Sequence, residues 1–219
     1  MNGELRNKWL LQQKEIFGNS VFLEKLDNPQ FNEIPNLEDF NKQIRNCQNC
    51  TLGATRTNFV FGIGNPDADL VFVGEAPGKN EDLQGEPFVG MAGKLLDNIL
   101  QTIGLNRSKV YILNVLKCRP PKNRNPLPHE LEQCEPYLKT QLKIIQPKLI
   151  IALGKVAAQT LLRIDISLSK MREKTYLYEN IDVLVTYHPA ALLRNPALKR
   201  PTWEDFKKIK TKYLLEGIS

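Results

Sequence analysis

The sequence predicts an α/β protein in which helices cover both faces of a parallel sheet. Apolar runs alternate with amphipathic segments along most of the 219 residues, as strands and helices do in such folds. Each apolar run is nearly unbroken, which indicates strands buried on both faces rather than half-exposed antiparallel strands. Ligands of parallel sheets bind beyond the carboxyl ends of the strands, so functional residues are expected there.

The pattern places strands and helices in order along the chain. The expected strands are the apolar runs at 70–74, 109–118, 148–154 and 181–189. The expected helices are the segments at 37–50, 91–104, 128–146, 155–163 and 202–217. The helix at 91–104 ends at a glycine, a residue that commonly terminates helices.

The chain divides into an N-terminal extension and one main domain. Residues 1–36 are polar, are expected to form short helices, and end in the linker "LDNPQFNEIPN". Residues 37–219 carry the strand and helix pattern. No apolar run approaches the roughly 18 residues that span a membrane, and the charged N-terminus is unlike a secretory signal, so we expect a cytoplasmic protein.

The loop "GEAPGKNEDLQGEPFVG" after the first strand is the first candidate binding site. It does not lead into a Walker motif, because Gly93-Lys94 is followed by Leu95 instead of a magnesium-binding serine or threonine. It also lacks the glycine spacing of dinucleotide sites. Phe88 in this loop is either a lid on the core or a stacking face for a flat ring. The helix that begins near Gly90 is expected to offer free N–H groups to an anion.

Three polar residues at the ends of separate strands, Glu75, Asn114 and His188, are expected to converge. Asn114 interrupts an apolar strand, so its amide either bonds a neighbouring loop or reads a base. A carboxamide can accept from uracil N3–H and donate to O4, whereas cytosine presents the opposite pattern. His188 is one of only two histidines and is a candidate donor to a developing oxyanion.

Four cysteines in a cytosolic protein indicate a metal centre rather than disulfides. Cys47 and Cys50 form C-x-x-C at the end of the first expected helix, and Cys118 and Cys134 follow later in the chain. Four thiolates without a nearby histidine suit zinc and a [4Fe–4S] cluster equally well. The net charge of +6 and the basic loops near 117–124 and 194–200 favour a polyanionic partner.

Several longer motifs resemble the family 4 uracil-DNA glycosylases of thermophilic bacteria and archaea. They are "RTNFVFGIGNPDADLVFVGEAPG", "GEAPGKNEDLQGEPFVGMAGKLL", "NVLKCRPPKNRNP" and "YHPAALLRNP", together with the C-x-x-C. The resemblance runs from about residue 37 to the C-terminus. It implies a three-layer α/β/α sandwich around a four-stranded parallel sheet, and a structural [4Fe–4S] cluster on all four cysteines.

The resemblance also implies a role for each site residue. A uracil flipped out of single- or double-stranded DNA would stack on Phe88 and be read by Asn114, with His188 near O2. Glu75, Ala76 and Pro77 would shape the pocket, and His188, Asn114 and Glu75 form the catalytic set. The segment "RNPALKR" would enter the DNA. The basic residues expected to bind phosphates are Lys117, Arg119, Lys122, Arg124, Arg194, Lys199 and Arg200.

The implied reaction breaks the N-glycosidic bond, releases uracil and leaves an abasic site without strand cleavage, as the first step of base excision repair. Family 4 lacks the aspartate that positions water in other uracil glycosylases, so Glu75 and Glu81 are both candidates for that task. We expect a monomer, with the segment "QKEIF" at 13–17 as a degenerate docking motif for a sliding clamp.

Three alternatives remain open from the sequence. The first is a glycosylase with a broader preference for deaminated bases. The second is a non-catalytic iron–sulfur module that binds DNA, although binding alone would not require Asn114 and His188 at strand ends. The third is a zinc protein.

Overall fold

The structure, a computed structural model, describes residues 36–215. The predictions for residues 1–35, namely the helical extension and the clamp-docking segment at 13–17, lie outside this range. Asn36 begins the described part by capping the first helix, since its side chain accepts a hydrogen bond from the Asp39 backbone.

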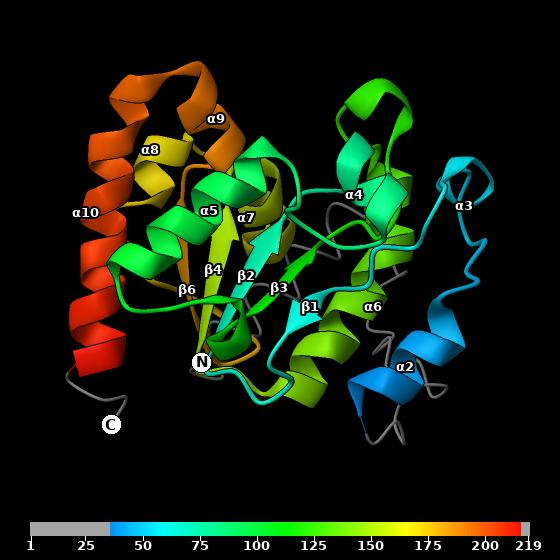
Figure 1. Ribbon diagram of the computed structural model, residues 1–219, viewed down its shortest axis with the longest axis horizontal. Helices are drawn as coiled ribbons and strands as arrows, with labels where there is room; N and C mark the ends of the chain where they lie inside the picture. Colours follow the sequence, from blue (N-terminus) through cyan, green and yellow to red (C-terminus); the bar gives the residue numbers. More distant parts are fainter. Residues whose placement is uncertain (1–35, 216–219) are drawn as a thin grey trace, which may run out of the picture. The chain divides into compact units, whose positions relative to one another are not determined.

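The core of the fold is a six-stranded sheet in the order β1-β3-β2-β4-β6-β5 (Figure 1). The strands are β1 (Ile63–Gly64), β2 (Leu70–Gly74), β3 (Tyr111–Asn114), β4 (Leu149–Leu153), β5 (Tyr176–Tyr178) and β6 (Ile181–Thr186). The central strands β3, β2, β4 and β6 are parallel, which confirms the expected four-stranded parallel sheet. The antiparallel edge strands β1 and β5 were not predicted, because two or three residues are too few to show a periodic pattern.

Helices connect the strands and form the outer layers. The α-helices are α2 (Leu37–Ile44), α3 (Leu52–Thr55), α4 (Lys79–Gln84), α5 (Met91–Thr102), α6 (Pro128–Ile145), α7 (Lys155–Leu162), α8 (Leu168–Met171), α9 (Pro189–Arg194) and α10 (Lys199–Ile209). Short 3₁₀ turns are η2 (Arg107–Lys109), η3 (Pro121–Asn123) and η4 (Pro196–Leu198), and α10 continues into the π-helical η5 (Lys210–Leu215). No helix of the described part is long and apolar enough to cross a membrane.

Two boundaries differ from the sequence prediction in ways that matter for the site. The first helix ends at Ile44 instead of 50, so Cys47 and Cys50 lie in the turns beyond it. The strand expected at 109–118 ends at Asn114, although the next two residues still donate backbone hydrogen bonds to Gly74 and Glu75. The chain then leaves the sheet, which takes Cys118 away from the strand end.

The sheet is packed on both faces, as the unbroken apolar strands predicted. On one face α5 and α10 contribute Leu96, Leu100 and Phe206 to a buried cluster with Phe72 of β2. The rings of Phe72 and Phe206 are stacked with centroids 6.1 Å apart. The helices α6 and α7 lie on the other face (Figure 1). The structure is thus an α/β/α sandwich whose strand ends are left free for a site.

Replacing Phe206 with alanine is expected to lower the free energy of unfolding by about 3–5 kcal/mol, because a fully buried ring leaves a cavity between α10 and the sheet. Trp203→Ala on the same helix is the matched control and is expected to change it by about 0.5 kcal/mol or less, since surface positions are tolerant. Urea unfolding measures both. Equal losses for the two variants would contradict this account of the core.

Candidate active site

A hollow of about 500 Å³ lies at the carboxyl edge of the sheet. The predicted residues Glu75, Asn114 and His188, which follow or end β2, β3 and β6, all line it. Ala76, Pro77 and Phe88 of the loop after β2 line it as well. The structure therefore brings together residues more than a hundred positions apart, as the strand-end argument expected.

Asn114 forms the buried floor of this pocket. It pairs with Gly74 across the parallel strands β2 and β3 and is 2% exposed. A Cβ atom on Gly74 would lie 2.3 Å from the Asn114 side-chain oxygen and 2.7 Å from the Phe88 ring, so only glycine fits there. Within residues 36–215 the side-chain amide of Asn114 has no hydrogen-bond partner, and its backbone oxygen accepts from Lys117 Nζ. The amide is therefore available to a ligand.

Phe88 fills the first of the two roles that the sequence left open, since it covers the core, and its stacking on a flat ligand ring stays a prediction. Its ring is 5% exposed and belongs to the core cluster, yet it also lines the pocket. It stacks on the imidazole of His188 with centroids 5.5 Å apart and an angle of 28° between the rings. Its backbone has a φ of 56°, a left-handed conformation that is rare for a bulky residue.

The surroundings of His188 keep its ring neutral, with the proton on one nitrogen. It caps α9, and its Nδ1 accepts the Ala190 backbone N–H at 3.1 Å, so the proton of the neutral ring sits on Nε2. Burial, with a smaller contribution from the charge of Arg194, lowers the pKa of His188 to about 4, against an opposing effect of Glu81. At neutral pH the ring is therefore uncharged and carries its proton on Nε2.

The two glutamates have different surroundings. Burial raises the pKa of Glu75, which lines the pocket with no competing ion pair in the described part of the chain. Glu81 is already engaged, because its Oε1 accepts the backbone N–H groups of Val89 and Gly90 at 2.9 Å each. The N–H of Gly90, the N-cap residue of α5, is therefore not free for an external anion, since the protein's own carboxylate occupies it. Of the two carboxylates that line the pocket, Glu75 is the one that makes no hydrogen bond to the loop in the described part of the chain.

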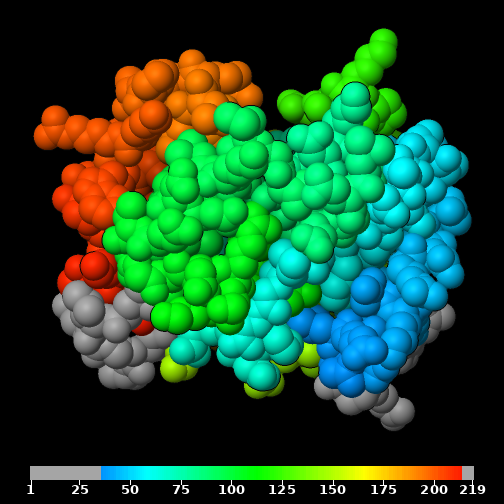
Figure 2. All heavy atoms as spheres, in the orientation of Figure 1, coloured from blue at the N-terminus to red at the C-terminus, as the bar shows by residue number. Residues whose placement is uncertain are grey.

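The basic loops rise on either side of the hollow (Figure 2). Arg194, Lys199 and Arg200 are exposed, as a phosphate contact requires. On the other side Lys122 is exposed, and Arg119 and Arg124 are half-buried. Those two arginines bond Asn123 and Glu130.

Lys117 is a correction to the predicted phosphate contacts. It is 0% exposed, and its Nζ donates to the backbone oxygen of Asn114 at 2.7 Å. Burial lowers its pKa to about 8, while the nearby Cys134 and Cys118 sulfur atoms oppose this shift. A side chain so enclosed cannot reach DNA in this structure. The sequence could not predict the burial of Lys117, because Lys117 belongs to a basic stretch and nothing there shows that the chain turns inward before Arg119.

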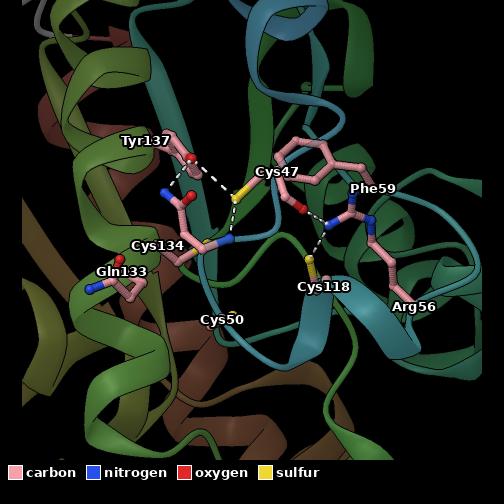
Figure 3. A pocket seen from close by; sticks show the side chains of 10 residues that line it. Cys47, Cys50, Arg56, Phe59, Cys118, Gln133, Cys134 and Tyr137 are labelled. Carbon is pink, nitrogen blue, oxygen red and sulfur yellow. Dashed lines mark hydrogen bonds between the residues drawn. The ribbon is translucent and has the colours of Figure 1, made fainter. Parts of the chain in front are cut away.

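The four cysteines line one small cavity on the far side of the β3 end (Figure 3). Three of their sulfur atoms face hydrogen-bond donors. The Tyr137 hydroxyl donates to Cys47 at 3.1 Å, Arg56 Nη1 to Cys118 at 3.2 Å, and the Lys117 backbone N–H to Cys134 at 3.3 Å. Such donors stabilise thiolates that bind a metal.

The four cysteines that line this cavity are the residues that could hold a metal ion or a cluster. Within residues 36–215, no three histidine, cysteine or acidic side chains are close enough to hold one metal ion. Burial raises the pKa of Cys134 to about 12, so formation of its thiolate is coupled to metal binding.

Comparison with known proteins places this fold and pocket in a family. The model of the uracil DNA glycosylase superfamily matches residues 61–207, and the chain belongs to this superfamily. A type-4 uracil-DNA glycosylase of Archaeoglobus fulgidus is 50% identical over 80% of this chain and 92% of its own. Type-4 enzymes of Sulfurisphaera tokodaii and Thermotoga maritima are 46% and 42% identical, over 81% and 83% of this chain and 84% and 96% of their own. The resemblance to family 4 is thereby confirmed.

The pKa of His188 predicts how stability depends on pH. The pKa falls from its usual 6.5 to about 4 on folding, so between these values the unfolded chain binds a proton that the folded protein does not. Stability is therefore lost as the pH falls through this window. The variant His188→Asn replaces the Nδ1 acceptor at the N-cap of α9 with an amide oxygen and removes the titrating ring, and is expected to lose less stability over the same range. Urea unfolding at several pH values tests this, and parallel curves for both proteins would contradict it.

Proposed function

We propose that the protein is a monofunctional uracil-DNA glycosylase that releases uracil from DNA, leaves an abasic site and so initiates base excision repair. The observation that carries the proposal is the meeting, in one pocket, of the available Asn114 amide, the neutral His188 donor and the Phe88 ring. Residues 37–219 would form the glycosylase domain.

Recognition requires that the base leaves the stack, because the pocket lies below the surface that DNA would contact. A flipped uracil would lie against Phe88 and exchange two hydrogen bonds with the Asn114 amide. Cytosine would leave the buried amide and the base with unmatched donors and acceptors, which is a costly kind of mismatch. Ala76 and Pro77 add apolar walls to the pocket.

The chemistry is the heterolysis of the bond between uracil N1 and the sugar C1′. The electron pair stays on N1, so a uracil anion leaves and an oxocarbenium-like sugar remains. His188 Nε2–H would donate to O2, where part of the negative charge accumulates. Water then adds to C1′ and loses a proton to solvent, and the uracil anion takes up a proton. Glu75 would orient this water.

The charges around the pocket would hold the DNA backbone. Arg194, Lys199 and Arg200 on one side would contact phosphates, and Arg119, Lys122 and Arg124 would do so on the other. These contacts supply affinity without reading sequence, which suits an enzyme that must find uracil anywhere. Arg124 would reach a phosphate while its guanidinium also bonds the buried Glu130.

Cys47, Cys50, Cys118 and Cys134 would hold a [4Fe–4S] cluster with a structural role. When bound, such a cluster supplies cross-links between thiolates that are distant in the chain. Here the cysteines lie beyond α2, after β3 and within α6, so they would fix the segment that follows Asn114. The donors from Arg56 and Tyr137 would stabilise the bound thiolates.

His188→Ala is expected to lower the rate of uracil release about 100- to 1,000-fold, the usual effect of removing one donor to a developing oxyanion. The control is His129→Ala, since His129 is the other histidine of the chain and is exposed at the start of α6. Single-turnover assays on an oligonucleotide with one uracil, followed by alkali, give the rate. Full activity of both His188→Ala and Asn114→Ala would refute the site assignment.

The purified protein is expected to contain about four irons and four acid-labile sulfides per chain, as a [4Fe–4S] cluster requires. Cys134→Ser should lose this iron, because one ligand is replaced by a harder oxygen donor. It should also unfold at lower urea, since the link between α6 and the β3 segment is gone. Stoichiometric zinc without sulfide in the native protein would refute the cluster.

A further inference from the structure

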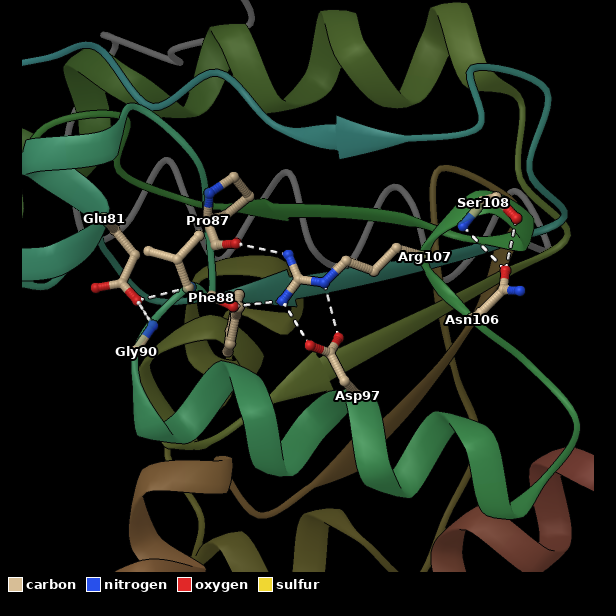
Figure 4. Close-up of polar contacts among 9 residues, drawn as sticks. Glu81, Pro87, Phe88, Gly90, Asp97, Asn106, Arg107 and Ser108 are labelled. Carbon is tan, nitrogen blue, oxygen red and sulfur yellow. Dashed lines mark hydrogen bonds and ion pairs between the residues drawn. The ribbon is translucent and has the colours of Figure 1, made fainter.

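Four consecutive residues of the pocket loop, 87–90, are held from two sides by side chains (Figure 4). Arg107 of η2 donates from Nη1 to the Pro87 oxygen at 3.1 Å and from Nη2 to the Phe88 oxygen. Glu81 of α4 accepts the next two backbone N–H groups, those of Val89 and Gly90. The peptide groups on both sides of the Phe88 side chain are thus fixed.

Arg107 is itself anchored by an ion pair with Asp97. Its Nε lies 2.7 Å from one oxygen of Asp97, and its Nη2 lies 3.3 Å from the other. Asp97 is on α5, so the guanidinium joins that helix to the loop. The planar fork of arginine makes all four contacts at once, which the single ammonium of lysine cannot do. Neither Arg107 nor Asp97 lines the pocket.

The geometry of Phe88 explains why such braces are needed. Its φ of 56° lies in the left-handed region, which is unfavourable for a bulky side chain and persists only when the surroundings enforce it. In an extended conformation the ring would point elsewhere and leave His188. The Phe88 backbone is also packed closely against the first turn of α5, because a Cβ on Gly93 would lie 1.6 Å from the Phe88 oxygen.

We propose that Arg107, anchored by Asp97, and Glu81 are positioning residues that hold Phe88 in its left-handed conformation and so set the stacking face for a flat pyrimidine ring. The inference rests on the proposed function for the identity of the ring. It assigns Glu81 to the loop and not to the attacking water. It also gives Arg107 a role in the proposed reaction, although the side chain of Arg107 does not line the pocket.

The test uses Arg107→Met, which removes the fork, and Arg107→Lys, which keeps the charge. Arg163→Met is the matched control, because Arg163 also forms an ion pair, with Glu135, but neither residue lines the pocket. The chain has only two histidines, so its imidazole signals in NMR can be assigned with His129→Ala. The ring of Phe88 shifts the His188 signals for as long as the two rings stay stacked.

In Arg107→Met the His188 signals are expected to move toward those of an unstacked imidazole. The kcat/KM for uracil release should fall about 10- to 100-fold, as expected when a reacting group is misplaced by about 1 Å. Arg107→Lys should lie between wild type and Arg107→Met in both measurements. Arg163→Met should match wild type in both, even where its stability is reduced.

Glu81 provides an independent arm of the test. Glu81→Gln keeps an oxygen that accepts the two N–H groups but removes the charge, whereas Glu81→Ala removes both. Glu81→Gln is expected to keep most of the activity and the stacked His188 signals, and Glu81→Ala to lose both. Loss of activity in Glu81→Gln with unmoved signals would overturn the proposal, because the charge itself would then be needed.

Unmoved His188 signals in a folded Arg107→Met protein would overturn the proposal, as would moved signals with unchanged uracil release. Failure of the wild-type protein to release uracil would instead contradict the proposed function. In that case the NMR comparison would still decide whether Arg107 and Glu81 hold Phe88.

Discussion

The pairing of Gly74 with Asn114 across β2 and β3 is the constraint on which the site depends. In this parallel register the Cα of Gly74, which has no side chain, lies beside the buried amide of Asn114. The Phe88 ring fills the remaining space. A shift of register by one residue would turn Asn114 to the other face of the sheet and replace it with an apolar side chain. The pocket is therefore a property of the strand pairing, and the loops complete it.

The same strand end ties the pocket to the four-cysteine site. Between Asn114 and Cys118 the chain turns inward, and the ammonium of Lys117 bonds the Asn114 backbone oxygen while its own N–H bonds Cys134. The side-chain amide of Asn114, the buried ammonium of Lys117 and the sulfur of Cys118 thus lie within five consecutive residues. Displacement of the cysteines would move Lys117, and the hydrogen bond from Lys117 would carry that movement to Asn114. This physical link would give the proposed cluster a structural reason to lie beside the proposed base pocket.

Much of the fold and site could be predicted because it depends on periodicity and strand direction. Continuous apolar runs indicated the parallel strands, and their shared carboxyl edge predicted that Glu75, Asn114 and His188 would meet. Contacts that depend on side-chain direction could not be predicted. Lys117 belongs to a basic stretch of the sequence but points into the core, and nothing in the sequence indicates that Glu81 binds Val89 and Gly90. Arg107 gave no signal either, since its partners lie 10 to 20 positions away in the chain.

The distribution of charge follows from what the pocket must stabilise. Full positive charges stay on the exposed rim, where phosphates can pair with them, and the floor holds dipoles: the Asn114 amide and the neutral His188 ring. A protonated His188 would have no acceptor for the Ala190 N–H, so α9 would lose its cap when the ring gained charge. Arg194 on the rim adds to the burial that keeps the ring neutral. A fixed neutral donor needs no counter-ion in the floor, and it is already oriented before negative charge develops on the leaving base.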